Sequence, residues 1–291
     1  MQIALSRRTP SANARRMASV IFRIVLALAC VVLPLLLLVP LVGRVTADPA
    51  WQPLVAAVKL ALILGVYALY VNRIEKRPAY ELALQRAARE WCGGIMLGAG
   101  LFGLVIALLS TFDAFRITGS GPWLPVAGML PGLLIGALFE EIMFRAIIFR
   151  ILEESIGSWL ALGISAAIFG LMHFMNPGAG VTGTLAVGIE AGILLGAAYM
   201  LTRRLWLCTA IHFAWNFTQG AIFSTAVSGH GHAGLFQSTL TGPAWLTGGK
   251  FGPEASVAAV IMCLAAGSAM LVICARSGAI VQPFWRHMPQ A

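Results

Sequence analysis

The chain has 291 residues, of which 59% are hydrophobic and 11% are charged, and its mean hydropathy is +0.86. A soluble domain is about 45 to 50% apolar and about 25% charged, so this composition excludes that class and indicates a membrane protein. Lys and Arg outnumber Asp and Glu by 20 to 11, but they form no basic stripe beside aromatic residues, so we expect no nucleic acid partner.

Long apolar segments follow one another along the whole chain. A membrane-spanning helix needs about 20 mainly apolar residues, and the sequence therefore predicts an all-α fold, a polytopic membrane helix bundle of about eight transmembrane helices. Residues 1–19 would form an N-terminal tail, 20–275 the bundle and 276–291 a C-terminal tail. The candidate spans are residues 20–43, 51–72, 92–112, 123–145, 158–175, 182–201, 205–225 and 255–275.

Basic residues between the spans predict the orientation. One side of the membrane would carry most of the Lys and Arg residues, and the opposite side would carry only Arg44, Arg116 and Lys250 outside the spans. By the positive-inside rule we expect both termini to be cytoplasmic. We expect an integral membrane protein of a bacterial inner membrane. The cations of the cytoplasmic side lie in the N-terminal tail, in the 73–90 loop and at Arg150, Arg203, Arg204, Arg276 and Arg286.

The N-terminal segment also has features of an export signal. Arg7-Arg8 precedes an apolar run that ends near Val45-Thr46-Ala47, as in a twin-arginine or secretory signal. The run is longer than a signal needs, so we favour a first anchor helix.

Ionisable groups inside spans are costly and mark functional or paired positions. In the fourth segment, Glu141 and Arg145 are four residues apart and share one helix face, whereas Glu140 points elsewhere. This spacing favours a structural pair of Glu141 with Arg145 and leaves Glu140 available as a base. The alternative is a solvated charge cluster at a cytoplasmic helix end.

Two further segments carry polar groups. The fifth ends at His173, just before a helix-breaking Asn176-Pro177-Gly178. The seventh places His212 and Asn216 one turn apart, where both can donate hydrogen bonds to an oxyanion. The alternative for all three is hydrogen bonding between helices.

Taken together, Glu140-Glu141 with Arg145, Phe169 with His173, and His212 with Asn216 form the ordered pattern EExxxR, FxxxH and HxxxN. This pattern resembles the CPBP family of intramembrane glutamic proteases, which includes the CAAX prenyl proteases and abortive-infection-like proteins. The motifs cover residues 140–216, and we expect a catalytic core at 123–225.

The resemblance implies an intramembrane endopeptidase, a CAAX protease-like hydrolase that acts on a peptide or membrane protein in lipid. Glu140 and His173 would activate a water, and His212 and Asn216 would hold the oxyanion. Glu141, Arg145 and Phe169 would support the site. No cofactor and no metal is expected, and the oligomeric state is open, as is processing of a CAAX-type C-terminus.

Other functions remain open. Glutamate and two histidines also suit zinc, although no HExxH is present and Asn216 is a poor ligand. A proton-coupled carrier would use Glu140, Glu190 and the histidines as a relay. A non-catalytic regulatory or immunity protein of the same fold is a third alternative.

Three further polar residues lie outside the motifs. Glu190 is a further acid within a span, and His230 and His232 lie in the glycine-rich 226–254 loop, which we interpret as flexible and not as a metal site.

In straight helices His173 would lie about 23 Å from the cytoplasmic side at about 1.5 Å per residue, away from Glu140. A tilt, a later helix start or a kink near Pro125 or Pro131 would close this gap.

Overall fold

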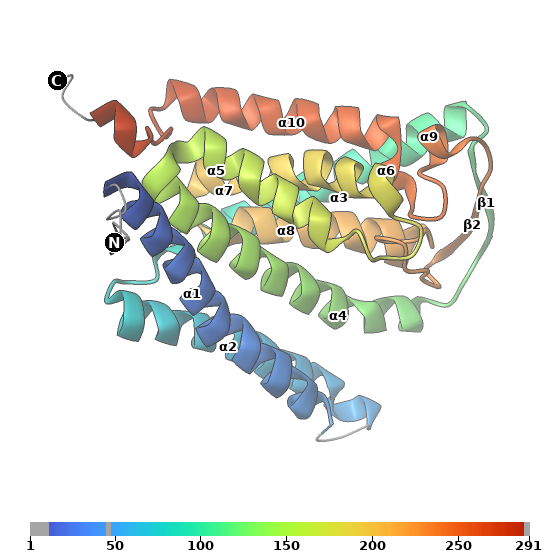
Figure 1. Ribbon diagram of the computed structural model, residues 1–291. Helices are drawn as coiled ribbons and strands as arrows, with labels where there is room; N and C mark the ends of the chain where they lie inside the picture. Colours follow the sequence, from blue (N-terminus) through green and yellow to red (C-terminus); the bar gives the residue numbers. More distant parts are fainter. Residues whose placement is uncertain (1–11, 45–47, 288–291) are drawn as a thin grey trace, which may run out of the picture.

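The computed structural model describes residues 12–44 and 48–287 (Figure 1). The residues that suggested an export signal, Arg7-Arg8 and Val45-Thr46-Ala47, lie outside the described residues. The chain is mainly helical, as predicted, and the helices pack side by side into one bundle.

Helices account for most of the described chain. The α-helices are α1 (Ala12–Gly43), α2 (Gln52–Tyr70), α3 (Ala87–Thr111), α4 (Trp123–Glu141), α5 (Arg150–Met172), α6 (Gly180–Val187), α7 (Ile193–Thr202), α8 (Leu205–Asn216), α9 (Ala244–Thr247) and α10 (Val257–Arg276). Four π-helical segments continue them without a break: η2 (Val71–Glu75), η4 (Ile142–Phe149), η5 (Gly188–Gly192) and η6 (Phe217–Ile222).

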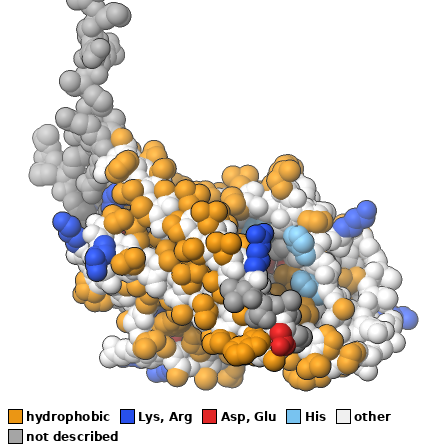
Figure 2. Space-filling view, turned by 90° about the horizontal axis from the view of Figure 1, so that it is seen from below, with side chains coloured by type: hydrophobic (Ala, Val, Ile, Leu, Met, Phe, Trp, Pro, Cys, Tyr) orange, Lys and Arg blue, Asp and Glu red, His pale blue; other side chains and the backbone are white. Residues whose placement is uncertain are grey.

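Five helices of the described residues are long and apolar enough to cross a membrane: Met17–Gly43, Gln52–Glu75, Ala87–Thr111, Gly180–Thr202 and Val257–Arg276. The most apolar 18 residues of Gly180–Thr202 are 72% buried, against 17% for Met17–Gly43. Gly180–Thr202 therefore lies at the centre of the bundle, and Met17–Gly43 lies at its periphery. Hydrophobic side chains cover most of the left half of the face in Figure 2, as expected of a surface in contact with lipid.

The bundle has two chemically different ends. At the first, which we name the basic end, α1 begins, α10 ends, α2 connects to α3, and α7 turns into α8 (Figure 1). At the second, which we name the sheet end, β1 (Phe115–Ser120) pairs antiparallel with β2 (Phe236–Leu240) (Figure 1). This two-stranded sheet, whose strands are far apart in the sequence, was not predicted.

The helix that contains the fourth predicted span continues beyond the end of that span. Helical structure continues from α4 through η4 into α5 and is interrupted only at Gly157, where φ is 79° and ψ is 168°. A side chain there would be strained by the positive φ and would lie 2.8 Å from the carbonyl oxygen of Val281. Helical structure therefore continues past residue 145, the end of the predicted span, because no helix breaker lies there.

Helices α3 and α8 pack closely through glycine. A Cβ atom at Gly98 would lie 2.4 Å from the carbonyl oxygen of Ile211, closer than real contacts allow. Gly98 therefore sets the approach of α8 next to His212. This close approach is between two helices of the same chain.

Candidate active site

Glu140 and Glu141 are the last two residues of α4, where the helix passes into the π-helical segment η4. Side chains of neighbouring elements bind carbonyl oxygens within η4. Ser165 Oγ donates to the carbonyl of Phe144 at 3.2 Å, and Arg150 Nε donates to that of Ala146 at 2.7 Å. Single π-helical turns occur frequently at functional sites, and these hydrogen bonds hold this one directly behind the two acids.

Glu141 and Arg145 form the ion pair that their spacing predicts. Arg145 Nη1 lies 3.1 Å from Glu141 Oε1, and both side chains are buried. Arg145 Nη2 also donates to the carbonyl oxygens of Ala191 and Gly192, at 3.1 and 3.4 Å. The guanidinium therefore joins η4 to η5 at the centre of the bundle.

His212 lies between the two carboxylates. Its Nδ1 is 2.9 Å from Glu141 Oε1, and its Nε2 is 3.9 Å from Glu140 Oε2. Because an ionised carboxylate only accepts hydrogen bonds, Nδ1 is the donor and Nε2 is directed toward Glu140. A distance of 3.9 Å is too long for a direct hydrogen bond and suits a bridging water.

Glu140 differs from its neighbour in exposure. Its side chain is 32% exposed, whereas that of Glu141 is 0% exposed. Within the described residues, its Oε2 atom is buried and has no hydrogen-bond partner. A buried, unpartnered carboxylate oxygen is costly, which makes this atom available to a water or a substrate.

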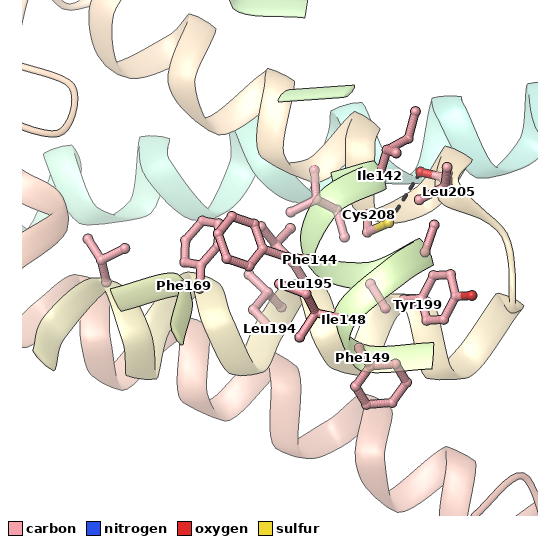
Figure 3. Close-up of a cluster of buried hydrophobic side chains, with 14 of the residues drawn as sticks. Ile142, Phe144, Ile148, Phe149, Phe169, Leu194, Leu195, Tyr199, Leu205 and Cys208 are labelled. Carbon is pink, nitrogen blue, oxygen red and sulfur yellow. Dashed lines mark hydrogen bonds between the residues drawn. The ribbon is translucent and has the colours of Figure 1, made fainter. Parts of the chain in front are cut away.

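Phe169 packs among the charged and aromatic groups of the site. Its ring lies 4.7 Å from Arg145 Cζ, within the range of a cation–π contact. The ring centroids of Phe144, His173 and His212 are 4.8, 4.9 and 6.2 Å away. Figure 3 shows Phe169 beside Phe144 in the hydrophobic cluster around η4. The first position of the FxxxH pattern therefore contacts all three motifs.

His173 caps the C-terminus of α5, which ends at Met172 before the predicted helix-breaking turn. Its Nδ1 lies 2.8 Å from the carbonyl oxygen of Phe169. A carbonyl oxygen only accepts, so Nδ1 is the donor in this hydrogen bond. Nε2 is thus the His173 nitrogen that is not bound to this carbonyl oxygen.

A cavity of about 30 Å³ joins the second and third motifs. A water needs about 10 to 15 Å³, so the cavity has room for one. Its polar lining residues are His173, Glu190, His212, Asn216, Ser228 and Glu254. Glu140 is not among them and reaches the site through its approach to His212.

The structure therefore brings all seven motif residues close to His212, Phe169 or this cavity, although Glu140 and His173 come from different depths of the sequence-predicted bundle. Pro131 lies within α4, as one of the suggested kinks requires. Sequence analysis identified Glu190 but missed Ser228 and Glu254. The signal for Glu254 was an acid just before the last apolar helix.

Residues 12–44 and 48–287 contain no preformed cluster of metal ligands, since no three His, Cys, Asp or Glu side chains there are placed to hold a metal ion. His230, in the loop with His232, is exposed, and its Nδ1 contacts the carbonyl oxygen of Ser228 at 3.1 Å.

Acids, histidines and an amide around one cavity are typical of enzymes that use acid–base chemistry. Residues 122–218 match the family model described as Type II CAAX prenyl endopeptidase Rce1-like. The resemblance predicted from the three motifs is confirmed by this match, which covers the part of the chain that carries all three motifs. No curated protein and no solved structure matches the chain.

Proposed function

We propose that this protein is an intramembrane glutamic endopeptidase that hydrolyses a peptide bond without a metal. The observation that carries the proposal is the gap of 3.9 Å between Glu140 Oε2 and His212 Nε2. Both atoms face a water-sized interval next to a cavity, and the Glu140 atom has no hydrogen-bond partner among the described residues.

In the proposed reaction, Glu140 takes a proton from the water as the water oxygen attacks the scissile carbonyl carbon. The carbonyl double bond opens and its oxygen becomes an oxyanion, which His212 and Asn216 stabilise by donating hydrogen bonds. The intermediate collapses, the C–N bond breaks, and the proton held by the acid–base pair of Glu140 and His173 passes to the leaving amine. No covalent enzyme intermediate forms.

His212 needs a particular protonation state for this role. Because its Nδ1 donates to Glu141, donation from Nε2 to an oxyanion requires the imidazolium form. Carboxylates on both sides of the ring provide favourable charge contacts for that form. Glu141, Arg145 and Phe169 would act as positioning residues, since Glu141 and Phe169 contact the histidines and Arg145 binds Glu141 and lies against Phe169.

We also propose that the bundle crosses a membrane eight times, with both termini in the cytoplasm, as in a bacterial inner membrane. The support is the charge difference between the two ends of the bundle. Within this arrangement, residues 1–19 and 276–291 are tails, and 123–225 form the catalytic core of the 20–275 bundle. The partners are lipid and a peptide or membrane-protein substrate.

A protease assay in lipid separates this function from its alternatives. Purified protein is mixed with quenched membrane peptides, with and without a chelator. We expect cleavage that survives chelation. Cleavage that is lost on chelation and restored by zinc would identify a zinc protease. Ion-coupled uptake by proteoliposomes without cleavage would identify a carrier, and partner binding without either activity would identify a regulatory protein.

A further inference from the structure

Residues 73–89, which we name the 73–89 segment, connect α2 and η2 to α3 at the basic end of the bundle (Figure 1). Gln52–Glu75, which ends in the segment, and Ala87–Thr111, which begins in it, are both long and apolar enough to cross a membrane. A short connection between two spanning helices lies at the membrane surface. The outward side chains of the segment are therefore next to lipid headgroups.

Both acids of the 73–89 segment are turned toward the bundle. Arg77 lies 2.6 Å from Glu75 and 2.9 Å from Glu81. Arg150 of α5 pairs with the same two acids, at 2.6 and 3.3 Å. The carboxylate side chains of Glu75 and Glu81 are only 9 and 4% exposed. The negative charge of the segment is therefore neutralised inside the protein.

The C-terminal part of the segment is attached to the residues around the start of α8. Trp206 Nε1 donates to the carbonyl oxygen of Ala83 at 2.8 Å. Glu90, the residue that follows the segment, is buried and pairs with Arg204. These contacts, together with the ion pairs of Arg150, fix which side of the segment faces outward.

The outward side of the segment combines cations with large apolar side chains. Its exposed cations form no ion pair among the described residues: Arg73, Lys76, Arg86 and Arg89. The apolar side chains that lie between them in the sequence are 46, 66 and 75% exposed: Ile74, Tyr80 and Leu84. No acid of the segment is exposed beside them. The outward side therefore carries only positive charge.

An anionic lipid surface fits both kinds of side chain. Exposed large apolar groups are unfavourable in water but insert favourably at the boundary between headgroups and acyl chains. Lys and Arg side chains extend from that depth to the headgroups, where the Arg guanidinium can bind two phosphate oxygens at once. A zwitterionic headgroup brings its own cation, so an anionic headgroup compensates the charge of the segment better.

We propose that the 73–89 segment lies in the headgroup layer and binds anionic phospholipids, with its exposed apolar side chains inserted and its four unpaired cations on lipid phosphates. The proposal does not rest on the proposed peptidase activity, because it depends only on the fold and on the charges of this segment. It is therefore tested by lipid binding alone.

The full chain in a neutral detergent is titrated with dioleoyl phosphatidylglycerol or dioleoyl phosphatidylcholine, and bound lipid is measured by native mass spectrometry. The wild type should bind phosphatidylglycerol at least about tenfold more tightly than phosphatidylcholine. This ratio should fall as salt rises from about 0.1 to about 0.5 M, because salt screens exposed charges. Equal affinities for the two lipids, or a ratio that salt does not change, would overturn the proposal without any variant.

Two triple variants locate the binding surface, since each removes one Lys and two Arg from exposed positions. The first carries Arg73→Gln, Lys76→Gln and Arg89→Gln in the segment. The matched control carries Arg44→Gln, Arg116→Gln and Lys250→Gln elsewhere. The segment variant should reduce the lipid ratio to about threefold or less, and the control should keep the wild-type ratio. An equal reduction in both variants would show that net charge, and not this segment, selects the lipid.

Soluble competitors separate a lipid from other anionic partners. Glycerophosphoglycerol, which is the phosphatidylglycerol headgroup without its acyl chains, should not displace the lipid at equal concentration, because it cannot use the apolar side chains. Displacement by this compound would assign the surface to a free phosphate ligand. Displacement by poly-glutamate at equal concentration would assign it to an acidic protein segment. Either displacement would overturn the proposal.

Discussion

The Nδ1 atom of His212 lies 2.9 Å from Glu141 Oε1, so the acid next to the proposed base orients the histidine. The same oxygen accepts from Arg145 at 3.1 Å. Two adjacent carboxylates thus have different environments: Glu141 is fully enclosed and its Oε1 binds two partners, whereas the side chain of Glu140 is 32% exposed; among the described residues, Oε2 of each acid has no hydrogen-bond partner. Neighbours on a helix point about 100° apart, which permits this division.

Removing one partner of the buried pair should destabilise the protein. Glu141→Gln leaves the Arg145 guanidinium without its counter-charge, and breaking a buried pair costs about 3 to 5 kcal/mol. We therefore expect a clearly lower Tm in detergent for Glu141→Gln and for Arg145→Ala, measured by tryptophan fluorescence. Glu140→Gln should keep the Tm of the wild type. Equal, mild effects on Tm and cleavage from all three changes would contradict the assigned roles.

The spacing between α3 and α8 should control activity. A Cβ atom at Gly98 would lie 2.4 Å from the carbonyl oxygen of Ile211, whereas Gly100 has nothing within 4 Å of a Cβ atom. Gly98→Val should displace α8 beside His212 and lower both Tm and the cleavage rate, since overpacking costs about 1 to 3 kcal/mol. Gly100→Val is the matched control and should leave both values near those of the wild type. The account of α8 placement fails if the two variants behave alike.

The aromatic ring of Phe169 should be needed for more than its volume. Phe169→Leu keeps an apolar side chain but removes the ring that lies 4.7 Å from Arg145 Cζ and packs against His173 and His212. We expect a loss of about 1 to 2 kcal/mol in stability together with a reduced cleavage rate. Phe174→Leu, at a position 48% exposed, is the control. A Phe169→Leu protein with wild-type rate and Tm would show that the ring does not position the histidines.

Glu254 should make stability depend on pH. Burial raises the pKa of Glu254 to about 7, despite hydrogen bonds from Gln219 and Ser228 and the nearby His212; Glu190 also faces it. The unfolded chain ionises this acid near pH 4.5, before the folded chain does, so its contribution to stability is present at low pH and is lost as pH rises from about 4.5 to about 7.

Measuring Tm from pH 4.5 to 8 for the wild type and for Glu254→Gln tests this sign. The variant should lose less stability as pH rises over that range, by an amount on the order of 3 kcal/mol at pH 8. A wild-type profile that becomes more stable relative to the variant as pH rises would mean that the folded protein favours the ionised form.

Short-range spacing predicted the parts of the site that lie on one helix. The pair of Glu141 with Arg145 and the shared cavity of His212 with Asn216 both follow from a four-residue separation. The contact between Glu141 of α4 and His212 of α8 joins residues that are 71 positions apart, so the repeat of a single helix cannot predict it. The same is true of the β1–β2 pairing across the bundle end.

The later boundary of the cavity was also beyond sequence reasoning. Ser228 and Glu254 follow residue 225, the predicted end of the catalytic core, and reach the cavity because the chain folds back between η6 and α10. The loop was interpreted as flexible because it is rich in glycine, but Glu254 binds its backbone at Ser228. Long-range hydrogen bonds of this kind depend on tertiary structure.

The most direct test of the central claim is the cleavage rate of three proteins in lipid: wild type, Glu140→Gln and Asp113→Asn. Asp113 is an exposed acid at the sheet end with a left-handed backbone, which Asn also adopts, so its variant controls for the loss of a carboxylate. All three should share one Tm. If Glu140 activates the water, the wild type and Asp113→Asn cleave a quenched membrane peptide at similar rates in the presence of chelator, and Glu140→Gln does not cleave it; cleavage by folded Glu140→Gln at the wild-type rate would contradict the account.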